Sequence, residues 1–238
     1  MTLYLAYNGT GRKTLELHAD DDAVNLLVAL PFLDDFQKHR DNFNLNRWCL
    51  DSGAFSAHNS GAVITYEQWA EAAKGCDADE VFGLDVIGDS KGTRRNLERA
   101  WADGIDAIPT FHFGEPWAAL DWCKESGRKI ALGGCARIHH SRRLAWAQQC
   151  FARAWPVRVH GFACSSNEAV SLLPFDSVDA TSWCYAPGAM GAWAGYTGKQ
   201  IQVKCRGVSD YWVEVREHQR RERKATARWR RTMKQLNK

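Results

Sequence analysis

The stretch that decides the fold is R-W-C-L-D-S-G-A-F, residues 47–55. It predicts a short apolar strand, W-C-L, that ends on Asp51 and turns sharply through Ser52 and Gly53. A carboxylate at the end of a buried strand has a fixed position, and the glycine after it lets a ligand approach the backbone. The alternative is a helix N-cap, because Asp and Ser also favour that position.

The same pattern, an apolar strand that ends in a polar or glycine-rich turn, recurs along the chain and alternates with helical segments. This alternation is typical of a parallel sheet. Eight strand–helix units in 238 residues predict an α/β protein with a (β/α)8 TIM barrel. A doubly wound sheet is the alternative, but no G-x-G-x-x-G follows the first strand. The predicted strands lie near 26–30, 47–51, 81–85, 107–112, 129–132, 157–162, 177–180 and 201–204.

Two segments lie outside these units. Leu3 to Tyr7 predicts a strand, and 13–18 is its expected partner in a short N-terminal hairpin, because N-G-T-G between them is a turn signal. A basic helix is predicted from about residue 210 onward. We therefore expect a TIM-barrel domain over 1–208 and a basic C-terminal helix over 209–238.

The composition is that of an ordinary globular protein, with 45% hydrophobic and 25% charged residues. No apolar run approaches the ~18 residues of a membrane span, and the N-terminus lacks a signal-peptide pattern. The eight cysteines are scattered without a C-x-x-C pair, which is typical of reduced thiols rather than a disulfide framework. We expect a cytoplasmic protein with no membrane partner.

The net charge of +3 conceals a segregation of charge along the chain. Residues 216–238 hold ten Lys and Arg against two Glu, a net of +8, which leaves −5 for residues 1–215. A basic end on a mildly acidic body indicates a polyanionic partner, with a solvated helix as the alternative. The cations expected to contact nucleic acid lie at spacings of three and four: Arg216, Arg220, Arg223, Lys224, Arg228 and Arg231.

The carboxyl ends of the predicted strands would meet on one face of a barrel, where catalytic residues lie. Three aspartates there suit glycosyl chemistry, in which one carboxylate attacks or shields an oxocarbenium-like carbon and another moves a proton to the leaving group. A third carboxylate can accept hydrogen bonds from the N–H edge of a purine, and a glycine pair lets a flat base lie against backbone amides. The residues expected on this face are Asp51, Asp85, His112, Gly133, Gly134, His160, Gly161 and Asp179.

Four motifs resemble a known family. L-D-S-G-A-F at 50–55, G-L-D-V at 83–86, A-L-G-G at 131–134 and V-D-A-T-S-W at 178–183 resemble, in this order, the tRNA-guanine transglycosylases, the queuine tRNA-ribosyltransferase type of enzyme. The match is closer to the phage and bacterial paralogues that exchange guanine in DNA for a 7-deazaguanine such as 7-cyano-7-deazaguanine. The resemblance covers roughly residues 26–204, and its first and last motifs are the more specific ones.

The resemblance implies a role for each of the three aspartates. Asp179 matches the family's nucleophile, which forms a covalent link to the ribose C1′. Asp51 matches the general acid/base, and Asp85 matches the aspartate that reads the edge of the base. The implied activity is a pentosyltransferase reaction through an aspartyl-glycosyl intermediate.

The resemblance also implies residues that contact the base. Gly133 and Gly134 match the family's backbone contact, and His112 with Phe113 stands where the tRNA enzymes carry a glutamine. Trp183, just after the nucleophile position, is predicted to stack on the base. The full expected set is His112, Phe113, Gly133, Gly134, Gly161 and Trp183, with Asp85.

Two departures from the family bear on cofactor and substrate. The tRNA enzymes carry a C-x-C-x-x-C zinc site with a later histidine, and this chain has no such spacing. Cys184, Cys205 and His218 are the remaining zinc candidates, but dispersed cysteines are more often core residues, so we predict no cofactor. The basic helix stands in place of the zinc subdomain, which favours DNA over a tRNA anticodon loop. The implied partners are DNA, a 7-deazaguanine base and other DNA-modification proteins, in a host cytoplasm if the chain is phage-encoded.

Three other functions remain open at this point. One is the same chemistry on tRNA. Another is a catalytically silent barrel that binds nucleic acid through its tail, although binding alone would need neither Asp51 nor Asp179. The last is a metal-dependent hydrolase that uses Asp51, His112, His160 and Asp179.

Overall fold

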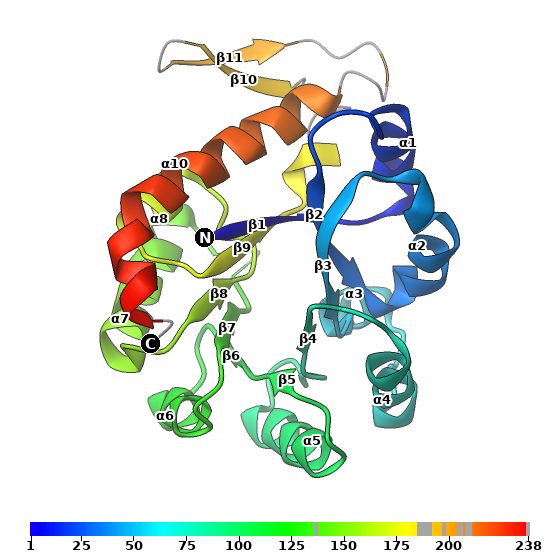
Figure 1. Cartoon of the computed structure of the whole chain (residues 1–238). Helices are drawn as coiled ribbons and strands as arrows, with labels where there is room; N and C mark the ends of the chain where they lie inside the picture. The colour runs from blue at the N-terminus through cyan, green and yellow to red at the C-terminus, as the bar shows by residue number, and fades with distance from the viewer. Residues whose placement is uncertain (136–137, 185–191, 197–198, 204–206, 208–210, 237–238) are drawn as a thin grey trace.

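A computed structural model describes residues 1–135, 138–184, 192–196, 199–203, 207 and 211–236. Its centre is a ring of parallel strands in the order β5-β4-β3-β2-β1-β9-β8-β7-β6, with helices around the outside (Figure 1). The fold is therefore the α/β TIM barrel that the sequence predicts. The strands are β1 Thr2–Ala6, β2 Val24–Ala29, β3 Leu45–Asp51, β4 Glu80–Phe82, β5 Ala107–Ile108, β6 Thr110–His112, β7 Ile130–Gly133, β8 Val159–Gly161 and β9 Ser177–Ala180.

The ring closes through the segment that holds β5 and β6. Pro109 separates the two, because proline lacks the N–H that a continuous ladder needs. β5 pairs with β4 on one side, and β6 pairs with β7 on the other. The two short strands thus fill one position, and the barrel has eight.

The predicted N-terminal hairpin is wrong. β1 is one of the strands of the barrel wall, where it pairs in parallel with both β2 and β9. The residues after it form a helix, α1 Gly9–Leu17, because Asn8 acts as an N-cap and accepts a hydrogen bond from the backbone N–H of Gly11. The N-G-T-G signal therefore marks a helix start rather than a hairpin turn.

The predicted last barrel strand is also wrong. Residues 199–203 form β11 (Lys199–Val203), which pairs in antiparallel fashion with β10 (Ala192–Tyr196) in a separate two-stranded sheet at the edge of the molecule (Figure 1). The count of eight holds because β1 replaces this strand in the ring. Barrel strands such as β2 are buried along their whole length, whereas I-Q-V-K at 201–204 alternates in the way of a strand with one exposed face.

The helices follow the strands in the order expected of a barrel. Thr65 begins α4 with a full capping box, in which its side chain and that of Gln68 each accept a hydrogen bond from the other's backbone N–H. The helical segments are α1 Gly9–Leu17, η1 Leu30–Phe32, α2 Leu33–His39, η2 Arg40–Asn42, α3 Ala54–Ser60, α4 Tyr66–Gly75, α5 Ser90–Ala102, α6 Trp117–Glu125, α7 His140–Ala154, α8 Asn167–Leu172 and α10 Trp212–Leu236. Among the described residues, no helix combines the length and apolar character needed to cross a membrane.

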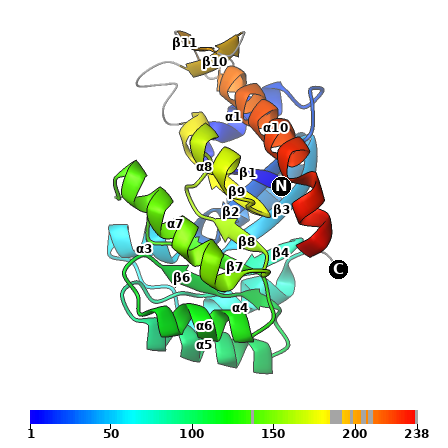
Figure 2. The same ribbon diagram turned by 90° about the vertical axis from the view of Figure 1, so that its left-hand side faces the viewer.

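The basic helix α10 packs against the outer side of the barrel beside β1 and α8 (Figures 1 and 2). Trp212 and Val215 belong to the main hydrophobic core, and each buried side chain of this size stabilises the fold by about 1.5–3 kcal/mol. Glu222 accepts a hydrogen bond from the backbone N–H of Leu3, and the indole N–H of Trp229 donates to the carbonyl of Val170. One face of α10 is therefore part of the barrel's structure.

The inside of the barrel is filled by one residue from each of several strands, which leaves no open pore. This layer consists of Tyr4, Leu27, Cys49, Phe82, Ile108 and Ala131. Above it, at the carboxyl ends of the strands, the interior becomes polar and opens into a cavity.

Candidate active site

A cavity of about 270 Å³ opens at the carboxyl ends of the barrel strands. The strand ends that surround it come from widely separated parts of the sequence, and the ring brings them together. Six of the residues predicted from the sequence line it: Asp51, Asp85, His112, Gly133, Gly134 and Asp179.

A larger and more open hollow of about 970 Å³ lies at the opposite, amino-terminal ends of the strands. Cations on its wall already pair with neighbouring carboxylates, Arg47 with Asp79 and Arg128 with Asp106. Because the chemistry of TIM barrels takes place at the carboxyl ends, the smaller cavity is the candidate active site.

Asp51 ends β3 and lies in the cavity wall. The turn after it depends on Gly53, whose φ of +75° favours glycine and whose missing Cβ leaves room for the ring of Pro31. The backbone N–H of Gly53 donates to the Asp51 carboxylate over 3.2 Å. Burial raises the pKa of Asp51 to about 7, and the negative charge of Asp85 adds to the rise. A carboxyl group with this pKa exchanges its proton near neutral pH, as general acid/base catalysis requires.

Asp85, His112 and Glu115 form a connected group on the next part of the wall. The Asp85 Oδ2 lies 2.7 Å from the His112 Nε2, and its Oδ1 accepts a hydrogen bond from the Ser52 hydroxyl over 2.8 Å. Glu115 accepts a hydrogen bond from the backbone N–H of His112 and lies 3.3 Å from its Nδ1. Burial alone would lower the pKa of His112, but the hydrogen bonds to Asp85 and Glu115 outweigh it and raise the pKa to about 9. His112 is thus an imidazolium held between two carboxylates.

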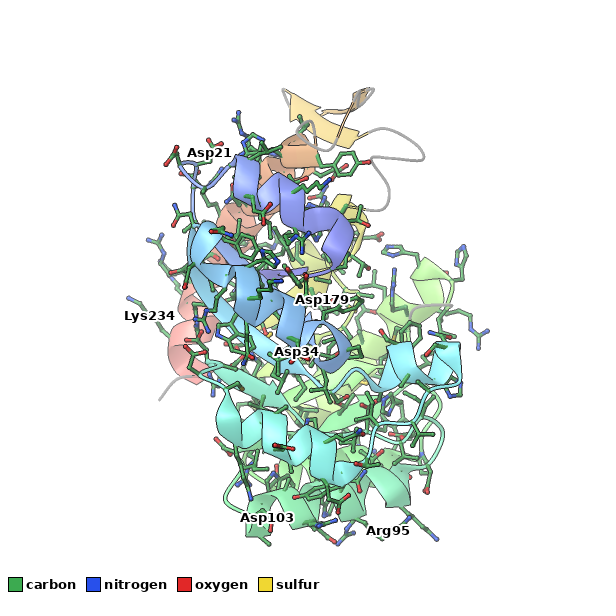
Figure 3. The ribbon with its side chains drawn as sticks, turned by 90° about the vertical axis from the view of Figure 1, so that its right-hand side faces the viewer. Asp21, Asp34, Arg95, Asp103, Asp179 and Lys234 are labelled. Atoms are coloured by element: carbon green, nitrogen blue, oxygen red, sulfur yellow. The ribbon has the colours of Figure 1, made fainter. Side chains whose placement is uncertain are left out.

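Asp179 lies in β9 with its side chain almost fully buried at the cavity floor; Figure 3 shows it inside the molecule. The backbone N–H of Ala163 donates to its Oδ1 over 2.8 Å. Ala163 has a φ of +54°, an uncommon conformation for a residue other than glycine. The His160 Nε2 lies 3.5 Å from the same oxygen. Both contacts fall on Oδ1.

The glycine pair at 133 and 134 forms a flat part of the wall. A Cβ on Gly133 would lie 2.9 Å from the Thr110 methyl group and 3.1 Å from the His112 ring. Gly134 has a φ of +72°, and a Cβ there would crowd the backbone of Phe113. Glycine at both positions therefore keeps His112 in place and exposes backbone to the cavity.

Three predicted base-contacting residues do not line the cavity. Phe113 turns outward and packs edge-on against Trp146. Gly161 packs against the Phe175 ring, and a Cβ at this position would lie 2.5 Å from that ring. Trp183 is fully buried, and its indole N–H donates to the carbonyl of Ala6. It fills core space beneath α1 and has no face free to stack on a base.

The structure adds residues that sequence reasoning missed. Ser52 and Glu115 orient Asp85 and His112, and Phe55 lines the cavity with 48% of its surface exposed. Phe55 belongs to the opening motif, which was the available signal for it. His160, expected on the face at the carboxyl ends of the strands, instead lies fully buried beneath Asp179.

No group of three or more His, Cys, Asp or Glu side chains in the described part of the chain is arranged to hold a metal ion. His218 is buried, with its Nδ1 2.7 Å from the carbonyl of Glu214, and the Asn8 side-chain amide donates to the Cys184 Sγ. Cys205, the third zinc candidate, lies outside the described residues. The hydrolase set is not assembled either, because His112 is held by two carboxylates and His160 lies below the cavity.

The fold and the site define a (β/α)8-barrel protein with a small, carboxylate-lined cavity at the carboxyl ends of its strands. No protein-family model matches the chain, and no curated protein matches it significantly. Among solved structures, the tryptophan synthase A-subunit from the hyperthermophile Pyrococcus furiosus is similar, with a TM-score of 0.46 and 16% sequence identity over 80% of this chain and 91% of that chain. This similarity concerns the fold alone.

Proposed function

We propose that this protein is a transglycosylase that exchanges guanine in DNA for a 7-deazaguanine base through a covalent aspartyl-glycosyl intermediate. The observation that carries the proposal is that Asp179 and Asp51 line one cavity. Within the described residues the contacts of Asp179 fall on Oδ1, and Asp51 has a pKa of about 7. A nucleophile and a proton shuttle are the two groups that a double-displacement glycosyl transfer needs.

In the first half of the reaction, Asp179 attacks C1′ of the deoxyribose while the bond from C1′ to the guanine nitrogen breaks. The electron pair of that bond leaves with the base, and protonated Asp51 supplies the proton that neutralises it. The second half is the reverse: ionised Asp51 removes a proton from the incoming base, whose nitrogen attacks C1′ and releases Asp179 as a carboxylate. No net oxidation or reduction takes place.

The size of the cavity supports a single base as the bound group. At about 270 Å³ it lies just below the ~300–1,000 Å³ typical of ligand pockets, which is too small for an oligonucleotide. The target nucleotide would therefore leave the base stack and enter alone, as in other enzymes that modify bases. Phe55, exposed at the edge of the cavity, is placed to stack on it.

The proposal is tested by mass spectrometry of nucleosides from the DNA and the tRNA of cells that express the chain and are supplied with 7-deazaguanine bases. A 7-deazaguanine deoxynucleoside is expected in DNA, and it should be absent from cells that express Asp179→Asn. Modification of tRNA alone would assign the same chemistry to tRNA. The absence of modification in both, with DNA binding retained, would favour the non-catalytic barrel.

Asp85 is proposed to choose the base rather than to drive the chemistry. Its carboxylate already accepts from Ser52 and His112, but each carboxylate oxygen has two lone pairs and retains capacity for the N–H edge of guanine. Replacing it with alanine is expected to weaken guanine and 7-deazaguanine binding by roughly 10- to 150-fold, the loss of a hydrogen bond to a charged group.

The measurement is competition between guanine and adenine for the free protein and for the exchange reaction. The control is Asp89→Asn, because Asp89 caps α5 through its side chain and does not line the cavity. Unchanged competition in Asp85→Ala would remove Asp85 from base selection.

The basic helix is proposed to supply affinity for phosphates without choosing the sequence. Arg220 pairs with Glu217, which interrupts the predicted stripe of cations. Figure 3 shows Lys234 near the end of α10 on the opposite side of the molecule from Arg95, which lies near the start of α5. No described residue of α10 lines the cavity. The exposed cations of α10 from the predicted set are Arg216, Arg223, Lys224, Arg228 and Arg231.

Replacing the last four of these with glutamine is expected to weaken DNA binding and to reduce the slope of log K against log salt by roughly one for each phosphate that the variant no longer neutralises. The preferred target should not change. Substitution is preferred to truncation because α10 also covers β1. The matched variant replaces four exposed cations of α5 and the start of α7 with glutamine: Lys91, Arg94, Arg95 and Arg142. A parental slope in the α10 variant and a reduced slope in the matched one would place the phosphate contacts on α5 and α7 instead.

A further inference from the structure

A chain of buried polar groups crosses the barrel interior from Lys129 to Asp179. Lys129 is almost fully buried, and its Nζ lies 2.8 Å from Glu80 Oε2, 2.9 Å from Asp176 Oδ2 and 2.7 Å from the Ser177 hydroxyl. An ammonium group has three protons and no acceptor. Lys129 therefore donates to each of these groups, including Ser177.

The direction of the first hydrogen bond fixes the next one. The Ser177 oxygen accepts from Lys129, so its own proton is available to donate, and the His160 Nδ1 lies 2.8 Å away. If Nδ1 instead carried a proton, the Ser177 oxygen would receive two donors, and no acceptor for the hydroxyl proton is found among the described residues. His160 Nδ1 is thus an acceptor.

His160 is neutral, because its complete burial lowers its pKa. A neutral imidazole carries one proton, and with Nδ1 as an acceptor that proton is on Nε2. The ring is held in place by Phe82 and Phe162, whose centroids each lie 4.6 Å from its own. Its Nε2 is fully buried and has no hydrogen bond of normal length within the described structure. It lies 3.5 Å from the Asp179 Oδ1.

We infer that His160 is a positioning residue for Asp179: its Nε2–H, fixed by the relay from Lys129 through Ser177, faces Oδ1 and leaves Oδ2 as the attacking oxygen. This inference rests on the proposed function for the role of Asp179, but not for the arrangement of the relay. When Oδ2 bonds to C1′, Oδ1 becomes the carbonyl oxygen of an ester. When that bond breaks, the negative charge returns to a carboxylate whose Oδ1 accepts from the Ala163 N–H and faces the His160 Nε2–H from 3.5 Å.

The arrangement itself is tested without any activity. Nitrogen-15 NMR of histidine-labelled protein distinguishes the two ring nitrogens, and His160→Gln identifies the His160 signals. A proton on Nε2 is expected in the unchanged protein, and Ser177→Ala should raise the share of the Nδ1–H form. A proton on Nδ1 in the unchanged protein, or on both nitrogens at neutral pH, would overturn the inference even if the protein exchanges bases.

The positioning role is tested by single-turnover formation of the covalent adduct at saturating DNA. His160→Leu should slow the adduct step by roughly 10- to 100-fold, the range expected when a charged group loses an N–H partner, with DNA affinity unchanged. His160→Gln keeps an N–H near the Nε2 position and should recover most of the rate. Tyr4→Phe alters a neighbour of the His160 ring and removes a 3.4 Å hydrogen bond from its hydroxyl to Glu80, but it leaves Lys129, Ser177 and His160 unchanged. It is the control for core perturbation, and thermal unfolding checks each variant.

The NMR experiment and the adduct measurement distinguish a failure of the positioning role from a failure of the proposed function. Equal adduct rates in the leucine variant and the unchanged protein would overturn the positioning role. If the unchanged protein forms no adduct, the proposed function fails, and the NMR result alone then decides whether the relay exists.

Discussion

Asp179→Asn is expected to abolish base exchange, with a loss of at least about 10⁴-fold, in the range seen when a covalent nucleophile is removed. The amide oxygen of asparagine can still accept from the Ala163 N–H that now bonds Oδ1, so the residue keeps its place in β9. What it loses is the negative charge that attacks C1′. The fold should survive, and the chemistry should not.

The measurement is formation of a covalent protein–DNA adduct, detected by its mass under denaturing conditions, together with incorporation of labelled base. The control is Asp34→Asn, which changes an exposed carboxylate on α2 (Figure 3) and should behave like the unchanged protein. Normal exchange by a folded Asp179→Asn protein would transfer the nucleophile's role to another group.

Asp51→Asn is expected to slow exchange by roughly 10²–10⁴-fold, the contribution of a positioned general acid/base. The pH dependence gives a sharper test, because the two halves of the reaction need opposite protonation states. With the pKa of Asp51 raised to about 7, its protonated form prevails below that pH and its ionised form above. Adduct formation should therefore fall as pH rises through about 7, while transfer to the incoming base should rise.

These profiles are measured by single-turnover kinetics of each half-reaction, over about two pH units on either side of neutrality. In Asp51→Asn both profiles should flatten near 7, although a residual adduct can still form because Asp179 is intact. If both halves follow pH in the same direction in the unchanged protein, Asp51 does not alternate between acid and base.

The site residues that lie at or just after the ends of strands were predictable from the sequence. Asp51, Asp85 and Asp179 each lie at or beside the end of an apolar strand, and a parallel barrel brings such ends together whatever their separation in sequence. The opening motif thus placed its aspartate correctly, and the glycine after it is needed for a left-handed turn.

The parts that depend on which way a side chain points were not predictable. Trp183 lies only four residues after Asp179, but the chain turns into a helical conformation at 182–184, and the Trp183 side chain points into the core under α1. The contact between Asp85 and His112 joins the loop after β4 to β6, and no local pattern encodes it. The first strand was misassigned for a similar reason, since its partners β2 and β9 distinguish a barrel strand from a hairpin and the second of them lies near the other end of the chain.

The position of β1 has a consequence for the order of events during synthesis. β1 leaves the ribosome before the other barrel strands, but one of its neighbours, β9, and its covering helix, α10, are made after all of them. Until β9 and α10 emerge, the apolar residues of β1 stay exposed to solvent on that side, and the ring of strands stays open between β1 and β9. Closure is thus a late step governed by contacts of long sequence separation, which slow folding and prolong exposure to aggregation. In a circular permutant that begins at β2 and carries β1 after α10, the ribosome would make β9, α10 and β1 close together in time. This permutant should form the closed barrel sooner.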